Sequence, residues 1–396
     1  MAKDNRQNTE NLNIETGAEK PEKKTGFFRR LLALLLVLAV VLMVAVLTTM
    51  GDGNYFSALR RWLIYGDGGE TRHLYTYSAD QGNLYGQLGE DLLVVGPNVI
   101  QLLKDNGTVI YEQQVGLSAP KLSMGTTQAA VCDVGGDTLY ILDELGIVRT
   151  DTLERGLVYY SVRMNSKDYL AVTSQKSGYK GAVAVYDREG ELLFRFDSSD
   201  SYISDAVVSE DGKTLLAVAL DTLDGAFASK LLVYDMASAQ RVAEYAIWDG
   251  LVLDYVMQGD RVLSLCDKRL TISTLAGETL LDRAYGNLYL HDYALTGEDF
   301  CALLLGRYQA GNIGQLITYD LEGQEIAALE ISEEVLDISA AGKHLAVLYS
   351  DSLVLYTRDL QEVARLDGTD YAGQVQLAPD GTALVIAGTS AWHYLP

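Results

Sequence analysis

Cysteine and histidine are scarce in this sequence, which has three cysteines and four histidines among 396 residues. Cys132, Cys266 and Cys301 each lie within an apolar run, and an odd number of such thiols does not make a disulfide framework. We expect all three to pack in a core, with a Cys266–Cys301 bridge as the alternative. The histidines share no metal-ligand spacing, and no glycine-rich phosphate loop or Gly-x-Ser-x-Gly motif occurs. The residues therefore predict no cofactor and no catalytic set, and they leave metal binding open.

Basic residues are also few, with 31 Lys and Arg against 54 Asp and Glu, a net charge of −23. Residues 31–396 hold 24 basic and 49 acidic residues, so the imbalance lies in this part of the chain. An acidic domain repels the phosphates of nucleic acids and of anionic lipid surfaces. We therefore expect no nucleic-acid partner, and a domain that is soluble or binds cationic partners.

One long apolar run, residues 31–50 (LLALLLVLAVVLMVAVLTTM), contains no charged residue. A helix of this length spans about 30 Å, the thickness of a bilayer's hydrocarbon core. A cleaved signal peptide is the alternative, but it would have a shorter apolar core and a small-x-small cleavage site. We predict a transmembrane signal-anchor helix over residues 27–50, and hence a membrane as one partner of the chain.

Charge on the two sides of this run predicts the topology. Five basic residues lie just before it and only Arg60 and Arg61 lie close after it: Lys20, Lys23, Lys24, Arg29 and Arg30. Positive residues stay cytoplasmic, so we expect residues 1–26 to form a disordered cytoplasmic tail and residues 51–396 to lie outside the cell. Residues 51–70 are expected to form a juxtamembrane amphipathic helix and a glycine-rich linker. The expected localisation is a single-pass protein of the cell membrane.

Long helical periodicity is absent from residues 71–396, which alternate in short apolar strands separated by Gly, Asp and Asn turns. These strands form a repeat, because the third strand of each unit tends to end in a hydrophobic residue followed by Asp. These aspartates recur every 38 to 48 residues, with one double gap of 85, at Asp105, Asp143, Asp187, Asp235, Asp320 and Asp359. The last unit is one strand short, and residues 72–77 offer an unassigned strand before the first unit. We predict an all-β propeller of about eight four-stranded blades, with seven as the alternative, closed by pairing of these two ends.

The Tyr-Asp strand ends, the Ser-Glu-Asp-Gly turn at 209–212 and the Pro-Asp-Gly turn at 379–381 resemble those of WD-repeat and YVTN-like β-propellers. The single span ahead of the repeats is similar to a family of membrane-anchored propeller proteins of Gram-positive bacteria whose function is unknown. The resemblance covers residues 72–396 and implies the propeller fold. The Trp-Asp dipeptide itself does not recur in the repeats and occurs once, at residues 248–249.

Four aspartates fall at equivalent places on the predicted innermost strands: Asp205, Asp254, Asp292 and Asp337. Alignment of the units places Tyr160 and Gln374 in the same position, with Lys121 and Tyr85 as further candidates. Innermost strands border the central channel, so the aspartates predict an acidic arc there. Either these carboxylates accept backbone N–H groups and brace the blades, or they converge on a cation or an amine.

The connections between second and third strands are long at 174–182, 221–230 and 306–314. Insertions confined to one face of a repeat array often mark its binding face. The candidate residues in these loops are Tyr179, Lys180, Asp224, Phe227, Tyr308 and Asn312. Tyrosines at the starts of inner strands, among them Tyr202, Tyr289 and Tyr371, belong to the same face. The expected function is a membrane-tethered extracytoplasmic scaffold that binds a protein or a cell-envelope polymer without catalysis. The alternative is a small-ligand or metal-dependent propeller enzyme or sensor that uses the acidic arc.

Overall fold

The structure is a computed structural model that describes residues 71–78, 82–223, 226–248, 250–311 and 313–396. The predicted tail, signal anchor and juxtamembrane helix, residues 1–70, lie outside these residues. Within the described ranges, no helix combines the length and the apolarity that crossing a membrane requires.

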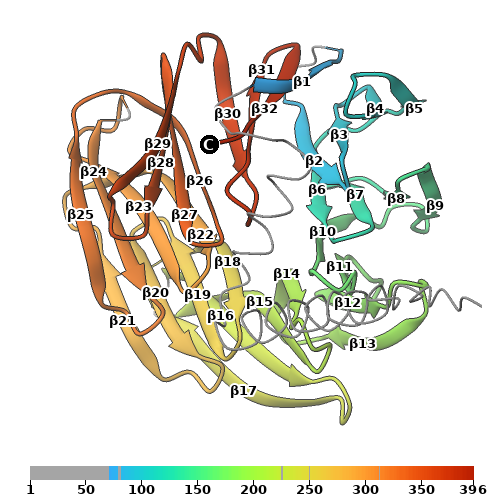
Figure 1. Cartoon of the computed structure of the whole chain (residues 1–396). Helices are drawn as coiled ribbons and strands as arrows, with labels where there is room; N and C mark the ends of the chain where they lie inside the picture. The colour runs from blue at the N-terminus through green and yellow to red at the C-terminus, as the bar shows by residue number, and fades with distance from the viewer. Residues whose placement is uncertain (1–70, 79–81, 224–225, 249, 312) are drawn as a thin grey trace, which may run out of the picture. The chain divides into compact units, whose positions relative to one another are not determined.

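The described chain folds into eight four-stranded antiparallel sheets, which we number as blades in chain order (Figure 1). Blades 1 to 4 comprise β2 (Leu84–Leu88), β3 (Asp91–Val95), β4 (Val99–Leu103) and β5 (Val109–Gln114); β6 (Pro120–Met124), β7 (Ala129–Asp133), β8 (Thr138–Asp143) and β9 (Gly146–Thr152); β10 (Tyr159–Met164), β11 (Leu170–Ser174), β12 (Gly181–Tyr186) and β13 (Leu192–Ser198); and β14 (Tyr202–Val208), β15 (Thr214–Leu223), β16 (Ala226–Asp235) and β17 (Gln240–Ile247).

Blades 5 to 7 comprise β18 (Val252–Gln258), β19 (Arg261–Cys266), β20 (Arg269–Thr274) and β21 (Thr279–Ala284); β22 (Tyr289–Gly297), β23 (Phe300–Gly306), β24 (Gly314–Asp320) and β25 (Glu325–Ile331); and β26 (Val335–Ala341), β27 (His344–Tyr349), β28 (Ser352–Thr357) and β29 (Glu362–Asp367). Blade 8 combines β30 (Ala372–Leu377), β31 (Ala383–Ala387) and β32 (Ser390–Tyr394) with β1 (Thr71–Thr76). Eight blades, rather than seven, are therefore confirmed.

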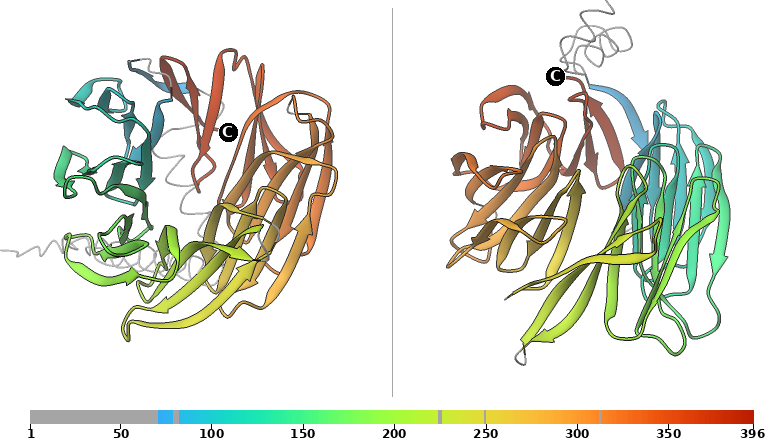
Figure 2. Two further views of the ribbon diagram at one scale, coloured as in Figure 1. Left: turned by 180° about the vertical axis from the view of Figure 1, so that it is seen from behind. Right: turned by 90° about the horizontal axis from the view of Figure 1, so that it is seen from below.

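The ring closes where the two ends of the described chain pair. β1 runs antiparallel to β32, with Thr71 opposite Tyr394 and Thr76 opposite Ser390. Tyr75 of β1 and Tyr77, just after it, pack in one cluster with Leu92 and Leu103 of blade 1, so this segment also fills the last gap between blades. The predicted closure by residues 72–77 is confirmed. Figure 2 shows the eight sheets arranged around a central axis.

The hydrophobic core is divided into eight clusters, one between each pair of neighbouring blades. Full burial of one Leu or Val side chain contributes about 1.5–3 kcal/mol, so contacts between blades supply much of the stability. All three cysteines belong to these clusters, and each is free and buried. Burial raises the pKa of each of these thiols to about 12. The expected packing role of the cysteines is confirmed.

The repeated aspartates have a local role in the turn between the third and fourth strands. The carboxylate of Asp187 accepts the backbone N–H of Glu191 at 2.7 Å, and that of Asp320 accepts the N–H of Gln324 at 2.7 Å. Gly190 and Gly323 occupy the left-handed region in these turns, with φ of 84° and 83°. Because a side chain with a Cβ adopts this conformation only at a cost, the Asp and the Gly recur together as turn signals.

The connections define two faces of the ring. The loop face carries the connections between second and third strands and the starts of the inner strands β2, β6, β10, β14, β18, β22, β26 and β30. The turn face carries the turns between first and second and between third and fourth strands. Since β1 starts opposite Tyr394 and ends opposite Ser390, it begins at the turn face and ends at the loop face.

Candidate functional site

The four channel aspartates share one backbone feature, a β-bulge immediately before each of them. The register of the inner strand shifts between Ile203 and Asp205, and at the matching place before each other aspartate: Asp254, Asp292 and Asp337. We call the residue after this bulge the arc position. A bulge turns the strand and re-aims the side chain that follows it. The predicted equivalence of the four aspartates is confirmed.

The arc position is filled differently in the remaining bulged blades. Gln374 follows the bulge of β30, as predicted. In β10 the register shifts between Tyr159 and Ser161, so Ser161 holds the arc position and Tyr160 is the inserted residue. The predicted place of Tyr160 is therefore wrong by one residue. The physical reason is that the spacing between blades varies, so repeat spacing alone does not define the arc position to within one residue, whereas strand pairing does.

Arg163 connects the first two aspartates of the arc. Its Nε donates to Asp205 Oδ2 at 2.7 Å and its Nη2 donates to Asp254 Oδ1 at 2.7 Å. A third N–H, on Nη1, donates to the carbonyl of Tyr255 at 3.1 Å, and the guanidinium lies 4.5 Å from the centre of the Tyr255 ring. One side chain of blade 3 therefore binds blades 4 and 5 by charge, hydrogen bonding and a cation–π contact.

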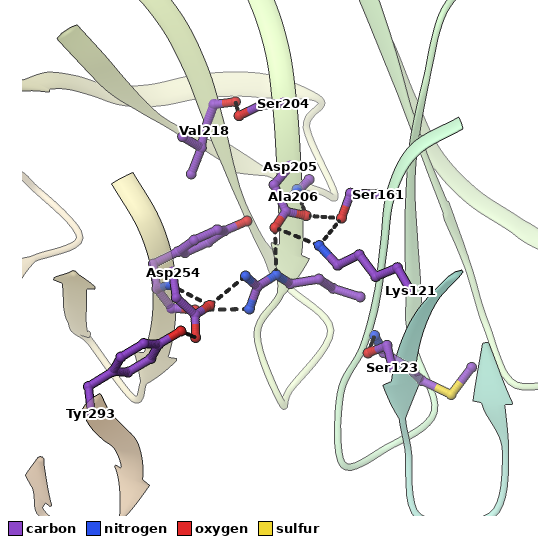
Figure 3. A network of polar contacts seen from close by, with 12 residues as sticks. Lys121, Ser123, Ser161, Ser204, Asp205, Ala206, Val218, Asp254 and Tyr293 are labelled. Atoms are coloured by element: carbon purple, nitrogen blue, oxygen red, sulfur yellow. Dashed lines mark hydrogen bonds and ion pairs between the residues drawn. The ribbon is translucent and has the colours of Figure 1, made fainter. Parts of the chain in front are cut away.

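The network extends to the blades on either side (Figure 3). Lys121 of β6 donates from Nζ to Ser161 Oγ at 2.7 Å and lies 3.4 Å from Asp205 Oδ2. The Ser161 hydroxyl donates to Asp205 Oδ1. On the far side, the hydroxyl of Tyr293 donates to Asp254 Oδ2 at 3.3 Å. Figure 3 shows Lys121 and Ser161 on one side of Asp205, with Asp254 and Tyr293 beyond the central guanidinium. Side chains of five consecutive blades, 2 to 6, thus form one polar network.

The charges of this network balance, with two cations and two carboxylates. The side chains of Arg163, Asp205 and Asp254 are 21%, 14% and 28% exposed, so solvent screens them only in part. Burial lowers the pKa of Arg163, but the charges of Tyr255, Asp205 and Asp254 raise it by more than burial lowers it. The pKa of Arg163 therefore lies above its usual value. The arginine is therefore charged at every accessible pH, and the two carboxylates are held in its field.

Asp292 and Asp337 have no cation beside them among the described residues, and each is instead bonded to backbone. Asp292 Oδ2 accepts the N–H of Ile338 in the next blade at 2.9 Å, and Asp337 Oδ2 accepts the N–H of Val375 at 2.7 Å. Burial raises the pKa of Asp292 to about 6. Burial also raises the pKa of Asp337 to about 7, with the nearby charge of Asp292 adding to it. These two aspartates brace neighbouring blades, as the first of the two predicted roles requires.

The arc is therefore divided and does not form one convergent carboxylate site. Two of its members are bound to Arg163, and the other two each bond to the blade that follows. In the ranges that the structure describes, no group of three or more His, Cys, Asp or Glu is placed to hold a metal ion. Sequence reasoning missed Arg163. The available signal was a lone arginine within an otherwise uncharged inner strand, two residues after the arc position.

The loop face presents the second set of candidate residues. All seven exposed aromatic side chains in the described part of the chain lie at this face, at or beside second-to-third connections, at the starts of inner strands or directly after a fourth strand: Tyr179, Tyr202, Phe227, Trp248, Tyr289, Tyr308 and Tyr371. Their exposed fractions run from 44% to 93%. Leu251, Leu253 and Ile313 add exposed aliphatic surface there. Seven aromatics at one end of the ring form what we call the aromatic face.

Charged groups lie among these aromatics. Lys176 pairs with Asp197 and lies 5.0 Å from the centre of the Tyr179 ring. Lys180 lies 5.2 Å from the centre of the Tyr202 ring. The predicted residues Tyr179, Lys180, Phe227 and Tyr308 thus all belong to this face, whereas Asp224 and Asn312 lie outside the described residues. Trp248 was missed, because it follows a fourth strand and not one of the long connections.

Comparison with solved structures confirms the predicted resemblance to WD-repeat propellers. Sqt1 of Saccharomyces cerevisiae is 10% identical, with 83% of this chain and 100% of that chain covered and a TM-score of 0.59. The C-terminal WD40 domain of Sif2 is 13% identical, with 83% and 100% covered and a TM-score of 0.56. BamB from Moraxella catarrhalis is 11% identical, with 81% and 98% covered and a TM-score of 0.52. At such identities the likeness shows the fold alone.

Two sequence comparisons complete these findings. The model of a family described as a family of unknown function, DUF5711, matches residues 69–370. No curated protein matches the chain.

Proposed function

The chain belongs to the family of unknown function DUF5711, and we propose that its propeller is a non-catalytic module, anchored in the cell membrane, that binds a protein partner outside the cell. The single observation that carries the proposal is the aromatic face, on which all seven exposed aromatic side chains of the described residues gather. Tyr, Trp and Phe are enriched at protein interfaces, and Trp and Tyr are enriched among the residues that dominate binding energy. Exposed apolar surface gathered in one region marks an interaction site more often than scattered residues do.

The surroundings of the aromatic face favour a protein over a lipid surface or a polymer of one charge. Lys230 pairs with Asp221 at 2.7 Å and with Glu244 at 3.2 Å, and Lys176 pairs with Asp197. Aromatic residues bordered by charges of both signs resemble the apolar centre and polar rim of a protein interface. The strong excess of acidic residues disfavours an anionic membrane or a nucleic acid at this face.

The channel network supports a role without catalysis. Asp205 and Asp254 are engaged by Arg163, and Asp292 and Asp337 hold backbone N–H groups of the next blade. These carboxylates are occupied in joining blades.

The chain that precedes β1 joins the propeller at the turn face, since Thr71 lies opposite Tyr394. Thr71, the first described residue, therefore lies at the opposite end of the ring from the aromatic face.

Site-specific photocrosslinking in the full chain in its own membrane tests this proposal. A photoreactive phenylalanine at Trp248 is expected to form an adduct of one defined protein mass. The matched control is Leu145, which is 84% exposed and lies in a turn on the turn face. We prepare Tyr202→Ala, Phe227→Ala and Trp248→Ala as single variants. At least one of them is expected to weaken capture tenfold or more, as truncation of a hot-spot residue does. Equal adducts at Trp248 and Leu145, or adducts with lipid alone, would overturn the proposal.

The anchor and the orientation have a separate test. Protease added to intact protoplasts is expected to remove the propeller and leave a fragment that contains residues 1–50. Protection of the propeller would show that it lies inside the cell. That outcome contradicts the proposed topology without bearing on the aromatic face.

A further inference from the structure

The channel contains a cavity of about 950 Å³ that extends to the turn face. Arg163 and Asp254 belong to its lining at the level of the polar network, and residues of the first-to-second turns, such as Gly259 and Gly342, belong to it at the other end. Residues that the bulges insert at the loop-face end of the inner strands, such as Leu253, do not line the cavity. The cavity thus has the network as its floor and opens away from the aromatic face. Its volume lies in the range of small-molecule sites, about 300–1,000 Å³.

The side chains that form the walls of this cavity are either apolar or already hydrogen-bonded to other blades. Leu122, Val207, Val256 and Met257 line it and are each only partly buried. Its polar side chains already bond across blade boundaries. Gln258 Nε2 donates to the carbonyls of Leu295 and Gly297 at 2.9 and 3.2 Å, and Thr296 Oγ1 donates to the carbonyl of Ala340 at 2.7 Å. A ligand therefore meets hydrocarbon along most of the wall.

The mouth of the cavity is different, because its lining includes three exposed carboxylates: Glu210, Glu298 and Asp299. Glu210 accepts a hydrogen bond from Ser166 Oγ at 3.0 Å, a neutral donor. Within the described residues no cation forms an ion pair with Glu298 or Asp299. The cavity therefore has hydrocarbon walls, a charge-balanced floor and negative charge only at its opening.

We propose that this cavity binds a ligand with an apolar body and one cationic group, an alkylammonium seated with its charge at the carboxylate mouth. The hydrocarbon walls select the body, and the carboxylates select the sign of the charge. The ammonium comes either from a free amphiphilic amine or from a lysine side chain of a peptide, which share this chemistry. The site lies on the turn face, so it is independent of the partner proposed for the aromatic face.

Three isosteric probes test the charge preference on the full chain in nanodiscs. They are 1-adamantylammonium, 1-adamantanol and 1-adamantanecarboxylate, measured by equilibrium dialysis. The ammonium is expected to bind about tenfold more tightly than the alcohol at low salt, less so at high salt, and the carboxylate least tightly. Equal binding of ammonium and alcohol would overturn the proposal. A Leu-Lys-Leu peptide compared with Leu-Gln-Leu shows which source of the ammonium is preferred.

Variants of the mouth and the wall locate the site. Glu298→Gln with Asp299→Asn is expected to reduce ammonium binding about five- to tenfold and to leave alcohol binding unchanged. Asn suits position 299, where φ is 60°, because Asn tolerates the left-handed region. The matched control is Glu333→Gln with Glu334→Gln, an exposed acidic pair on the loop face. If this control pair weakens binding equally, the proposal is wrong.

Filling the cavity separates binding to the protein from partition into lipid. Val256→Trp is expected to abolish binding of all three probes, and Val256→Met, a smaller change, to weaken it if the tryptophan variant does not fold. Unchanged binding in a folded Val256 variant would place the probes elsewhere and overturn the proposal.

Discussion

Two halves of the channel carry aspartates in the same backbone position with opposite surroundings. Asp205 and Asp254 lie beside Arg163 and form ion pairs with it in a balanced network. Asp292 and Asp337 lack such a cation in the described structure, bond to the next blade, and have pKa values raised to about 6 and about 7. The difference originates two residues after the arc position, where blade 3 has Arg163 and blade 5 has Val256. The same residue therefore joins blades by charge in one half and by a backbone hydrogen bond in the other.

Removal of the shared cation is expected to have the largest effect. Arg163→Met leaves Asp254 without its cation and Asp205 with Lys121 alone, which should cost about 3 kcal/mol in the free energy of unfolding. Denaturant unfolding of the full chain measures it. Asp205→Asn and Asp254→Asn, added to the Arg163→Met background, should restore part of the loss because they remove the unpaired charges. A cost below about 1 kcal/mol would show that the network is a surface feature.

Asp337→Asn should increase the free energy of unfolding, and the size of the increase should depend on pH. The folded pKa of Asp337 is raised above its unfolded value of about 3.9. Its contribution to stability is therefore complete below pH 4 and is lost as pH rises through about 7. Since Asn still accepts the N–H of Val375, the variant should be more stable than wild type at pH 8, by on the order of 2 kcal/mol, and similar at pH 4. Equal destabilisation at both pH values would contradict a raised pKa.

An arginine introduced at position 256 would give Asp292 and Asp337 the kind of cation that Asp205 and Asp254 have in Arg163. Arg163 reaches the arc positions of the next two blades, and Val256 stands in the equivalent place before Asp292 and Asp337. Val256→Arg is expected to lower the pKa of both carboxyls by about one unit, or about 1.4 kcal/mol. Carboxyl carbon chemical shifts followed by NMR titration measure this change. Val256→Met is the uncharged control and should leave both pKa values unchanged.

The smallest effect is expected at the edge of the network. Tyr293→Phe removes the hydroxyl that donates to Asp254 at 3.3 Å, a long hydrogen bond. The loss should be about 0.5 kcal/mol, at the low end for a hydrogen bond to a charged group, because Arg163 still holds Asp254. A loss as large as that of Arg163→Met would mean that Tyr293, and not the arginine, positions this carboxylate.

The sequence was sufficient to predict the fold because the fold repeats. Spacing of the third-strand aspartates, the short last unit and residues 72–77 predicted the number of blades and the closure, each from local pattern alone. The four aspartates were aligned correctly for the same reason. Tyr160 was not, since the spacing between blades varies and only the pairing of β10 with β11 shows that Ser161 follows the bulge.

The partners of the arc were beyond sequence reasoning. Arg163 is 42 residues from Asp205 and 91 from Asp254, and their meeting depends on how three blades are placed around the channel. The aromatic face was predicted in part, because long connections are visible in the sequence and exposure is not. Tyr255 and Tyr289 both lie near the starts of inner strands, yet the first is 1% exposed and the second 46%. Tyr255 comes directly after the arc position Asp254, whereas Tyr289 begins its strand three residues before Asp292, and this difference shows only once the bulges are located.

The closure of the ring by β1 has a mechanical consequence. A pull on the chain ahead of Thr71, directed along β1 and out of the turn face, would draw that strand lengthwise past β32. All of the hydrogen bonds between Thr71 and Thr76 and their partners on β32 would then bear the load together, in shear, instead of opening one after another. The strand that completes blade 8 is thus also the element through which any tension on the preceding chain reaches the propeller. Its antiparallel pairing resists that tension along its strongest direction.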